Sequence, residues 1–551
     1  MLSLNEILVG QLMKGKMKKS LFILFFSTSL CFASSAQVWQ WSVAVDSVIS
    51  SETHAHPQAF LWIPENCKQV RAVVFTQHNM VEQGMLEHPL FRKTMSELSI
   101  AEVWITPGIN MPFDFTKDAG NDFTYMMKQL ADVSGYKELE QAPVIPLGHS
   151  AYATFPWNFA AWDPARTLAL VSVHGDAPQT NLTGYGGVNV DWGDRNIDGV
   201  PSLFIMGEYE WWEDRIKPAF DYIAKHPSSV ISLFADAGHG HFDYSDEMIE
   251  YVCTFIKKAA QNRLPKSMSV YKPDVLINIK PQQGWLMDRW HKDSLPQAAA
   301  APYADYNGDR RYASWVFDKQ MADATEKFYA KARKKINQYI GFKQNGETVY
   351  PDKSHADYNL KFIPLADGIS FNLNAFFADT LRIRAVNNHA KTPLTIERIC
   401  GPVEKINDTT FQISFYRMGF NNPKRSSDIW LLASNKGDDT YKSAVQQLAM
   451  RFPLVNKEGA EQRIIFPKIE NIKQGVKSIT LAATSSAGLR VYYYVKEGPA
   501  EVRANKLEFT KIPLRSKYPV KVTVVAWQYG RSTGDKIKSA EPVEQSFYIS
   551  K

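Results

Sequence analysis

The sequence has few cysteines and no long apolar run. Four of the 551 residues are Cys, and only Cys67, Cys253 and Cys400 would remain after removal of an N-terminal leader. An odd, scattered set of this kind excludes a disulfide framework, permits at most one bridge, and has no spacing typical of a metal site. No segment after the leader approaches the roughly 20 apolar residues of a transmembrane helix, so we expect no membrane span.

A strong charge bias is also missing. The chain has 63 basic and 57 acidic residues, a net charge of +6, and no dense basic run. This balance argues against nucleic acid as a partner. The hydrophobic content of 45% is that of a globular protein. Because a chain of this length exceeds a single hydrophobic core, we expect two or three domains, without internal repeats.

Residues 1–36 are typical of a secretory signal peptide. Lys16, Lys18 and Lys19 precede the apolar run 21–26, and small residues at 34–36 precede Gln37. Met17 is a good alternative start. The leader predicts export to the periplasm or the extracellular space.

Residues 37–265 are predicted to form an α/β domain with a mostly parallel sheet, because short apolar runs alternate with helical patterns. The strands are expected at 70–75, 101–105, 144–147, 168–173, 203–206 and 230–234. One helix has its apolar stripe over 123–130 and ends at Gly135, and the last helix is capped by Ser245 and has its stripe over 248–256.

The second half of the chain is predicted to be rich in β-strands. Residues 266–460 are expected to form a mixed linker and β-rich domain, in which a linker-like stretch is followed by a long helix whose apolar stripe covers 317–336. Residues 461–551 alternate apolar and polar side chains, as in 520–524, which predicts an all-β sandwich of immunoglobulin or fibronectin III type. This sandwich is expected to be non-catalytic.

The chemistry concentrates at the end of the third predicted strand, in the segment Gly148-His149-Ser150-Ala151-Tyr152-Ala153. Small residues let a chain turn sharply from strand to helix, which exposes the Ser hydroxyl and points the next backbone N–H at a developing oxyanion. The segment resembles the G-x-S-x-G nucleophile elbow of the α/β-hydrolase superfamily. It departs from that pattern at Tyr152, in place of the second glycine, and Pro146 removes a hydrogen-bond donor from the preceding strand.

The resemblance implies a catalytic triad in the order Ser, acid, His, with Ser150 as the nucleophile. The acid is predicted to be Glu210, three residues after Gly207 at the end of a strand, with Glu208 and Asp176 as alternatives. The base is predicted to be His241, in the loop before the last helix. His239 is the alternative base, and otherwise it is expected to line the pocket.

Further site residues follow from the same resemblance. The backbone N–H groups near Asn79 and of Ala151 are expected to form the oxyanion hole, with the Asn79 side chain as another donor. Trp211 and Trp212, beside the predicted acid, could stack on sugars, and so could Trp285 and Trp290. Residues 194–199 match the start of a calcium loop, but Ile205 stands where the bidentate Glu is needed, so we expect no EF-hand. The triad requires no metal and no organic cofactor.

Together these features predict a secreted serine carboxyl-ester hydrolase. The architecture resembles that of secreted carbohydrate esterases of polysaccharide-degrading bacteria, which implies an acetyl, methyl or feruloyl ester on a plant glycan such as pectin as the substrate. A serine peptidase with the same triad is one alternative. A non-catalytic glycan-binding protein with a degenerate hydrolase domain is another. The sequence gives no indication of oligomeric state.

Overall fold

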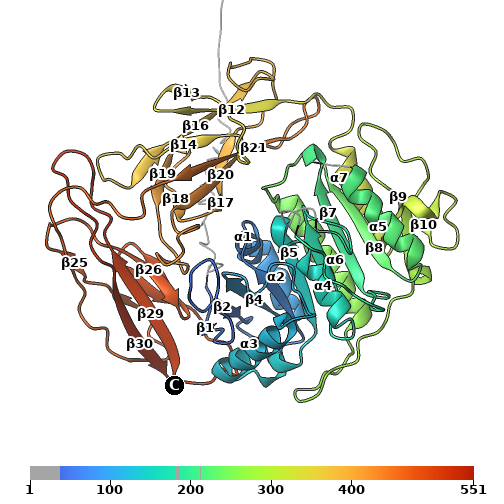
Figure 1. The fold of residues 1–551 in the computed structure, drawn as a ribbon, viewed down its shortest axis with the longest axis horizontal. Helices are drawn as coiled ribbons and strands as arrows, with labels where there is room; N and C mark the ends of the chain where they lie inside the picture. The colour runs from blue at the N-terminus through green and yellow to red at the C-terminus, as the bar shows by residue number, and fades with distance from the viewer. Residues whose placement is uncertain (1–37, 182–186, 211–212) are drawn as a thin grey trace, which may run out of the picture. The chain divides into compact units, whose positions relative to one another are not determined.

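The computed structural model describes residues 38–181, 187–210 and 213–551. Its largest element is a sheet of eight strands in the order β1-β2-β4-β3-β5-β6-β7-β8 (Figure 1). The six strands from β4 to β8 in this order pair in parallel, whereas β1 and β2 are antiparallel at one edge. The strands are β1 (Trp41–Ala44), β2 (Gln58–Trp62), β3 (Ala72–Gln77), β4 (Ile100–Thr106), β5 (Val144–His149), β6 (Leu170–Val173), β7 (Pro201–Gly207) and β8 (Val230–Asp236).

Helices cover both faces of this sheet (Figure 1). They are α1 (Glu82–Leu86), α2 (Pro89–Leu98), α3 (Ala119–Ser134), α4 (Phe155–Trp162), α5 (Glu213–Lys225) and α6 (Asp246–Arg263). Alternate residues of a strand point to opposite faces, so Val74 of β3 packs in one core with α2 and α6, whereas Val73 and Phe75 pack in another with α3 and α4. Helix α5 packs with α4 in a further core. The two-sided burial explains why these strands are continuous apolar runs.

The six predicted strands of this sheet are confirmed within a few residues. The two helix ends are confirmed as well: Gly135 ends α3 with φ +85°, and the Ser245 side chain accepts a hydrogen bond from the N–H of Met248 at 3.0 Å. Strands β1 and β2 were not predicted. These two strands pair in antiparallel. They do not belong to the alternation of strands and helices from which the parallel sheet is predicted.

Pro146 lies where the ladder between β5 and β6 changes register. Val144 stands opposite Thr167, but Leu147 stands opposite Val171. The advance of three residues along β5 therefore corresponds to four residues along β6, so the pairing is irregular between these points. The donor that Pro146 lacks falls in this irregular stretch, which explains how a central strand tolerates the proline.

Residues 281–330 extend the same domain. They form a small sheet of β9 (Trp285–Asp288), β10 (Ala301–Pro302) and β11 (Ala313–Val316), followed by helix α7 (Lys319–Ala330). The prediction of a helix reaching residue 336 is wrong at its end, since α7 stops at Ala330 and Ile336 is exposed. Trp290 is only 3% exposed and packs in the core beside α6 and α7, so the prediction of a sugar platform there is also wrong.

The rest of the described chain forms small, mostly antiparallel sheets, and only the pairs β14/β21 and β23/β30 are parallel in it. Strands that share one core are β12 (Tyr339–Gln344), β13 (Glu347–Val349), β14 (Asn359–Lys361), β15 (Ser370–Asn372), β16 (Asn374–Ala378), β17 (Thr395–Cys400), β18 (Val403–Lys405), β19 (Thr410–Ile413), β20 (Asp428–Asn435) and β21 (Ala444–Arg451). The last strands are β22 (Ile464–Ile465), β23 (Ile472–Lys473), β24 (Ser478–Thr480), β25 (Thr484–Ser485), β26 (Tyr492–Glu497), β27 (Ala500–Arg503), β28 (Lys506–Phe509), β29 (Val520–Trp527) and β30 (Val543–Ser550).

The C-terminal strands do not form an isolated core. Phe466 and Val522 belong to the same apolar cluster as Phe75 and Phe123 of the α/β domain. The guanidinium of Arg515 also pairs with the buried carboxylate of Glu138 at 2.8 Å. The three cysteines of the described chain are free thiols.

Candidate active site

Ser150 stands at a sharp turn between β5 and a short 3-10 helix, Ser150–Tyr152. Its φ is +53°, a left-handed conformation that a non-glycine residue adopts only where the surroundings enforce it. Gly148 permits the turn, because a β-carbon there would lie 2.0 Å from the carbonyl oxygen of Tyr152. The Ser150 hydroxyl lies 2.7 Å from Nε2 of His241. The segment therefore has the strained turn that is typical of a nucleophilic serine.

His241 lies in the loop between β8 and α6 and contacts two of the predicted site residues. Its Nε2 faces Ser150, and its Nδ1 is hydrogen-bonded to Oε2 of Glu210. With Nδ1–H bonded to a carboxylate, Nε2 presents its lone pair to the serine hydroxyl, which is the tautomer that a general base requires.

Glu210 ends a 3-10 turn, Glu208–Glu210, directly after β7. Its Oε1 accepts hydrogen bonds from the N–H of Gly207 at 3.2 Å and from Nδ1 of His174 at 2.5 Å. Burial alone would raise the pKa of Glu210, but the imidazoles of His174 and His241 hold that pKa well below its usual range. The carboxylate is therefore ionised and oriented at every ordinary pH.

The two alternative acids have other partners. Glu208 pairs with Lys442 at 2.8 Å, and both side chains are almost completely buried. Its second oxygen accepts from the N–H of Gly238. Asp176 accepts a hydrogen bond from the hydroxyl of Thr154 at 3.4 Å. Of the three carboxylates, the structure places Glu210 against His241.

The predicted oxyanion donors differ in their surroundings. Ala151 lies in the first turn of the 3-10 helix, where a backbone N–H has no partner within the helix. The N–H of Asn79 donates to Oε2 of Glu82 at 3.1 Å, and its side-chain amide donates to the carbonyl of His149 at 3.1 Å. The backbone donor of Asn79 is thus already engaged, and its side-chain amide also faces Nδ1 of His149 at 3.5 Å. The oxyanion role of Asn79 stays a prediction.

Among the remaining predicted residues, His239 is paired with a carboxylate of its own, and two tryptophans lie outside the described residues. His239 is hydrogen-bonded through Nδ1 to Asp243. Burial would lower the pKa of His239, but Asp236 and Asp243 raise it to about 10. Its predicted role as a pocket residue stays a prediction. Trp211 and Trp212 lie outside the described residues.

Two buried histidines beside the triad were missed from the sequence. His149 precedes Ser150, and its Nε2 bonds the carbonyl of His241 at 2.7 Å while its N–H donates to Glu82. Burial, followed by the neighbouring His241 and His174, holds the pKa of His149 well below its usual range, so its imidazole is neutral. His174 follows β6 as Glu210 follows β7. A polar residue directly after a parallel strand is the signal that could have found it.

Side chains from the β-rich half also lie near His241. The ring of His355 is 6.0 Å from that of His241 and 4.8 Å from that of Phe242, and Trp430 lies 5.0 Å from Phe242. Arg425 donates to the carbonyl of Asn79 at 2.6 Å. No local motif marks these residues, because only the tertiary fold brings them to the site.

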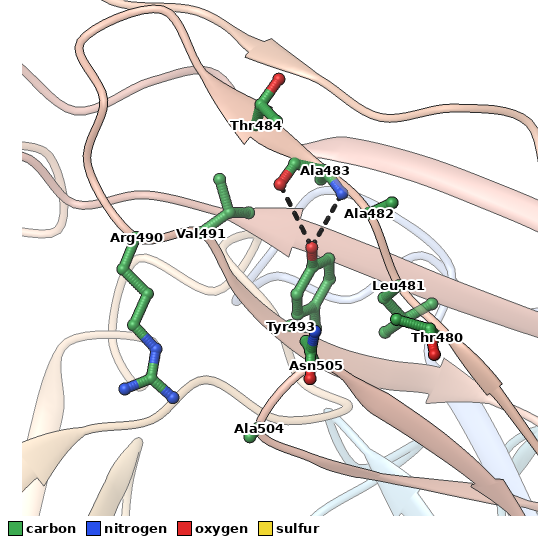
Figure 2. A pocket seen from close by; sticks show the side chains of 10 residues that line it. All are labelled: Thr480, Leu481, Ala482, Ala483, Thr484, Arg490, Val491, Tyr493, Ala504 and Asn505. Atoms are coloured by element: carbon green, nitrogen blue, oxygen red, sulfur yellow. Dashed lines mark hydrogen bonds between the residues drawn. The ribbon is translucent and has the colours of Figure 1, made fainter.

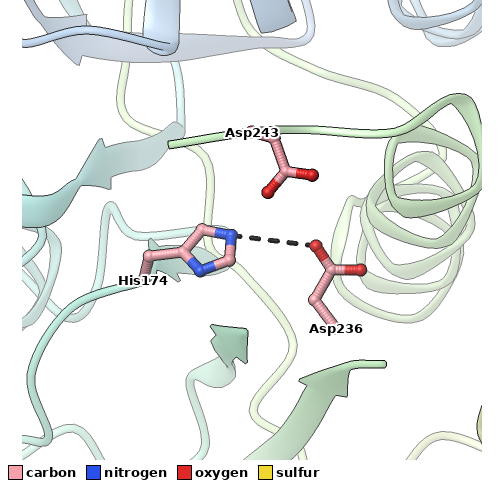
Figure 3. Close-up of side chains that lie close together, drawn as sticks. All are labelled: His174, Asp236 and Asp243. Atoms are coloured by element: carbon pink, nitrogen blue, oxygen red, sulfur yellow. Dashed lines mark ion pairs between the residues drawn. The ribbon is translucent and has the colours of Figure 1, made fainter. Parts of the chain in front are cut away.

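One group of side chains, His174, Asp236 and Asp243, offers ligand atoms within 4.8 Å of one another (Figure 3). Both oxygens of Asp243 already accept hydrogen bonds, one from His239 and one from the N–H of Gly240. Only two of the three side chains therefore have a ligand atom without a hydrogen-bond partner. A structural zinc site needs four ligands and a catalytic zinc site needs three from the protein. The group is better described as a set of buried ionisable side chains, in which His174 lies between Asp236 and Glu210.

Comparisons with known proteins find solved structures that resemble part of this chain. No protein family model matches the sequence, and no curated protein matches it. Fluorophosphonate-binding serine hydrolase F of Staphylococcus aureus is 12% identical, with 40% of this chain and 97% of that chain covered at a TM-score of 0.28. A hyperthermophilic esterase of Pyrobaculum calidifontis is 14% identical, with 41% and 88% covered at 0.29. A monoglyceride lipase variant of Saccharomyces cerevisiae is 14% identical, with 37% and 91% covered at 0.28.

These likenesses are too distant to carry an argument about activity. The evidence that bears on activity is the contact of Ser150 with His241 and of His241 with Glu210. Among the described residues, no helix combines the length and apolar character needed to cross a bilayer.

Proposed function

We propose that the chain is a serine carboxyl-ester hydrolase of the α/β-hydrolase superfamily. The observation that supports this is the unbroken line of contacts from Ser150 through His241 to Glu210. Each member follows a different strand of the parallel sheet, so all three meet at the carboxyl edge, where α/β sheets bind ligands. A serine hydroxyl is only a weak nucleophile at neutral pH and needs this arrangement to react at a useful rate.

The geometry supports acyl transfer in two steps. His241 Nε2 takes the proton of Ser150 as Oγ attacks the ester carbonyl, and Glu210 stabilises the imidazolium that forms. The Ala151 N–H and the Asn79 side-chain amide would hold the oxyanion, each such donor contributing about 3 kcal/mol. His241 then gives the proton to the leaving alcohol. In the second step it activates water, which attacks the acyl-enzyme and releases the acid.

The direct experiment measures hydrolysis of short p-nitrophenyl esters and of peptide p-nitroanilides by the purified protein and by Ser150→Ala. The proposal expects turnover of esters that Ser150→Ala lacks. Preferential cleavage of the anilides would favour a peptidase, and no turnover of either class would favour a degenerate, glycan-binding hydrolase domain.

We propose further that the ester is carried by a plant glycan, and that residues 461–551 form an immunoglobulin-like or fibronectin III-like sandwich. The support for the glycan is a pocket of about 530 Å³ in this region, whose lining combines five apolar residues with Thr480, Thr484, Arg490, Tyr493 and Asn505 (Figure 2). The Tyr493 hydroxyl is fixed by the N–H of Ala483 at 2.9 Å. The fixed aromatic ring and the hydroxyl, amide and guanidinium groups around it are types that bind sugars.

This substrate class is tested by release of acetate, methanol and ferulate from a panel of polysaccharides. Arg490→Ala and Asn505→Ala should raise KM for the polymer and leave turnover of a small aryl ester unchanged, because they remove only remote contacts. The matched control is Arg463→Ala, an exposed arginine of the same region outside the pocket lining. Equal kinetics of both variants and control on polymer would contradict the binding role.

We also propose that the protein is exported, because residues 1–36 resemble a signal peptide. The structure does not describe these residues. N-terminal sequencing of protein from a cell fractionation tests it. Mature protein beginning near Gln37 outside the cytoplasm supports export, and an intact leader on cytoplasmic protein contradicts it.

A further inference from the structure

His174 is a buried titratable residue that the acyl-transfer steps do not use. It follows β6 directly, is completely buried, and has a φ of +49°. A histidine in this left-handed conformation carries an energetic cost and persists only where its surroundings hold it. The cost indicates that the placement of this side chain matters.

The contacts of His174 join the triad acid to a second buried carboxylate. Nδ1 bonds Oε1 of Glu210 at 2.5 Å, so each oxygen of Glu210 faces a different imidazole, His174 on one side and His241 on the other. On the other side of the ring, Nε2 lies 3.8 Å from Oδ2 of Asp236 (Figure 3). Asp236 is fully buried, and neither of its oxygens has a hydrogen-bond partner in the described structure.

We propose that His174 is a positioning residue of the triad, which fixes the Glu210 carboxylate for His241 and supplies a positive charge beside it. The inference rests on the proposed serine-hydrolase function and adds a residue to it. Glu210 has to keep one oxygen on Nδ1 of His241 throughout the reaction. A second, charge-assisted hydrogen bond on its other oxygen removes the freedom to rotate away.

The charges around His174 favour its protonated form. It faces Glu210 from the turn after β7, Asp236 from β8, Asp243 and His241 from the loop before α6, and His149 from β5. Burial would lower the pKa of His174, but Glu210, followed by Asp236 and Asp243, raises it. The acidic side chains on both sides of the ring thus favour the imidazolium form of His174.

That positive charge has a consequence for the base. A carboxylate that is partly neutralised by His174 stabilises protonated His241 less than a free carboxylate would. Removing the charge of His174 should move the acid limb of the reaction to higher pH.

The test uses His174→Asn, because Asn accepts a positive φ and places an amide donor near the position of Nδ1 without a charge. His174→Gln is the second neutral variant, and His56→Asn, an exposed histidine, is the matched control. The rate of Ser150 modification by a fluorophosphonate probe is measured from pH 4 to pH 9, together with kcat/KM for an aryl acetate.

We expect the acid limb of His174→Asn to lie about one pH unit above that of the wild type, with the control unchanged. His174→Gln should add a loss of rate of about tenfold, because its donor sits farther from Glu210. Superimposable profiles of wild type and both variants would overturn the proposal. Failure of both variants to fold, judged by circular dichroism against the control, would assign His174 to the fold and overturn it as well.

The same data separate this inference from the proposed function. If the wild type reacts with the probe but hydrolyses no ester, the ester-hydrolase function fails, and the labelling profiles still decide the role of His174. If the wild type hydrolyses esters and the profiles coincide, only the role of His174 fails. A stoichiometric metal that is present in the wild type and lost in His174→Asn would make His174 a ligand and would also contradict the proposal.

Discussion

Tyr152 packs directly against Gly108: a β-carbon on Gly108 would lie 2.5 Å from the Tyr152 hydroxyl oxygen. Gly108 thus leaves room for the ring of Tyr152, the residue that stands in place of the second glycine of a G-x-S-x-G elbow. Gly108→Ala should displace the Tyr152 ring and with it the turn that carries Ser150. We expect kcat for an aryl acetate to fall about tenfold or more, since small misplacements of reacting groups are costly.

A second change provides the control. In Gly108→Ala combined with Tyr152→Gly, the ring that collides is gone, so activity should recover relative to Gly108→Ala alone. Steady-state kinetics of the single and double variants decide this. An unaffected Gly108→Ala variant would contradict the coupling between these two residues.

Glu210 and Glu208 are two residues apart, but their substitution is expected to change different properties, catalysis for Glu210 and stability for Glu208. Glu210→Gln should lower kcat/KM by about 10³-fold to 10⁴-fold, because it disturbs the tautomer and the orientation of His241. Glu208→Gln should leave the reaction intact but lower the free energy of unfolding by about 3 kcal/mol, because buried Lys442 loses its main partner. Kinetics and urea unfolding of both variants check this, and an inactive, stable Glu208→Gln would contradict the assignment of the acid.

His241 and His239 can be separated in the same manner. His241→Ala should remove nearly all turnover with little effect on unfolding. His239→Ala should mainly reduce stability, because the ion pair with Asp243 is lost. If turnover responds in the reverse order, the base is His239.

The raised pKa of His239 also predicts how stability depends on pH. A histidine whose pKa rises from 6.5 to about 10 on folding stabilises the fold fully below pH 6.5, and this contribution is lost as the pH rises through 10. The melting temperature of the wild type should therefore fall more steeply than that of His239→Gln between these limits. Parallel curves would show that the Asp236, Asp243 and His239 cluster does not hold this charge.

Residues 461–551 should be dispensable for chemistry but not for solubility. Truncation before Glu461 removes Phe466 and Val522 from a cluster that includes Phe75 and Phe123, which exposes apolar surface. We expect less soluble protein, with unchanged turnover of a small aryl ester per labelled active site. Loss of turnover in the folded fraction would mean that these residues support the active site.

The parts of the fold and of the candidate site that can be predicted are those marked by a short pattern in the sequence. The six strands, Ser150, and the loop with His241 follow from short apolar runs and one motif. The position of Glu210 three residues after Gly207 is equally local. His174 and Asp236 each stand at or directly after the end of a parallel strand, but their contact with the triad needs the strand order β6-β7-β8. His355 and Arg425 come from distant segments and carry no local signal at all.

The most direct measurement of the central claim is covalent labelling with a fluorophosphonate probe, followed by peptide mass spectrometry. The account predicts a single adduct on the peptide containing Ser150, absent in Ser150→Ala and slowed by about 10³-fold or more in His241→Ala. Ser150→Ala should remain folded by circular dichroism, since it removes one oxygen. An adduct on another serine, or labelling of Ser150→Ala at the wild-type rate, would contradict Ser150 as the nucleophile.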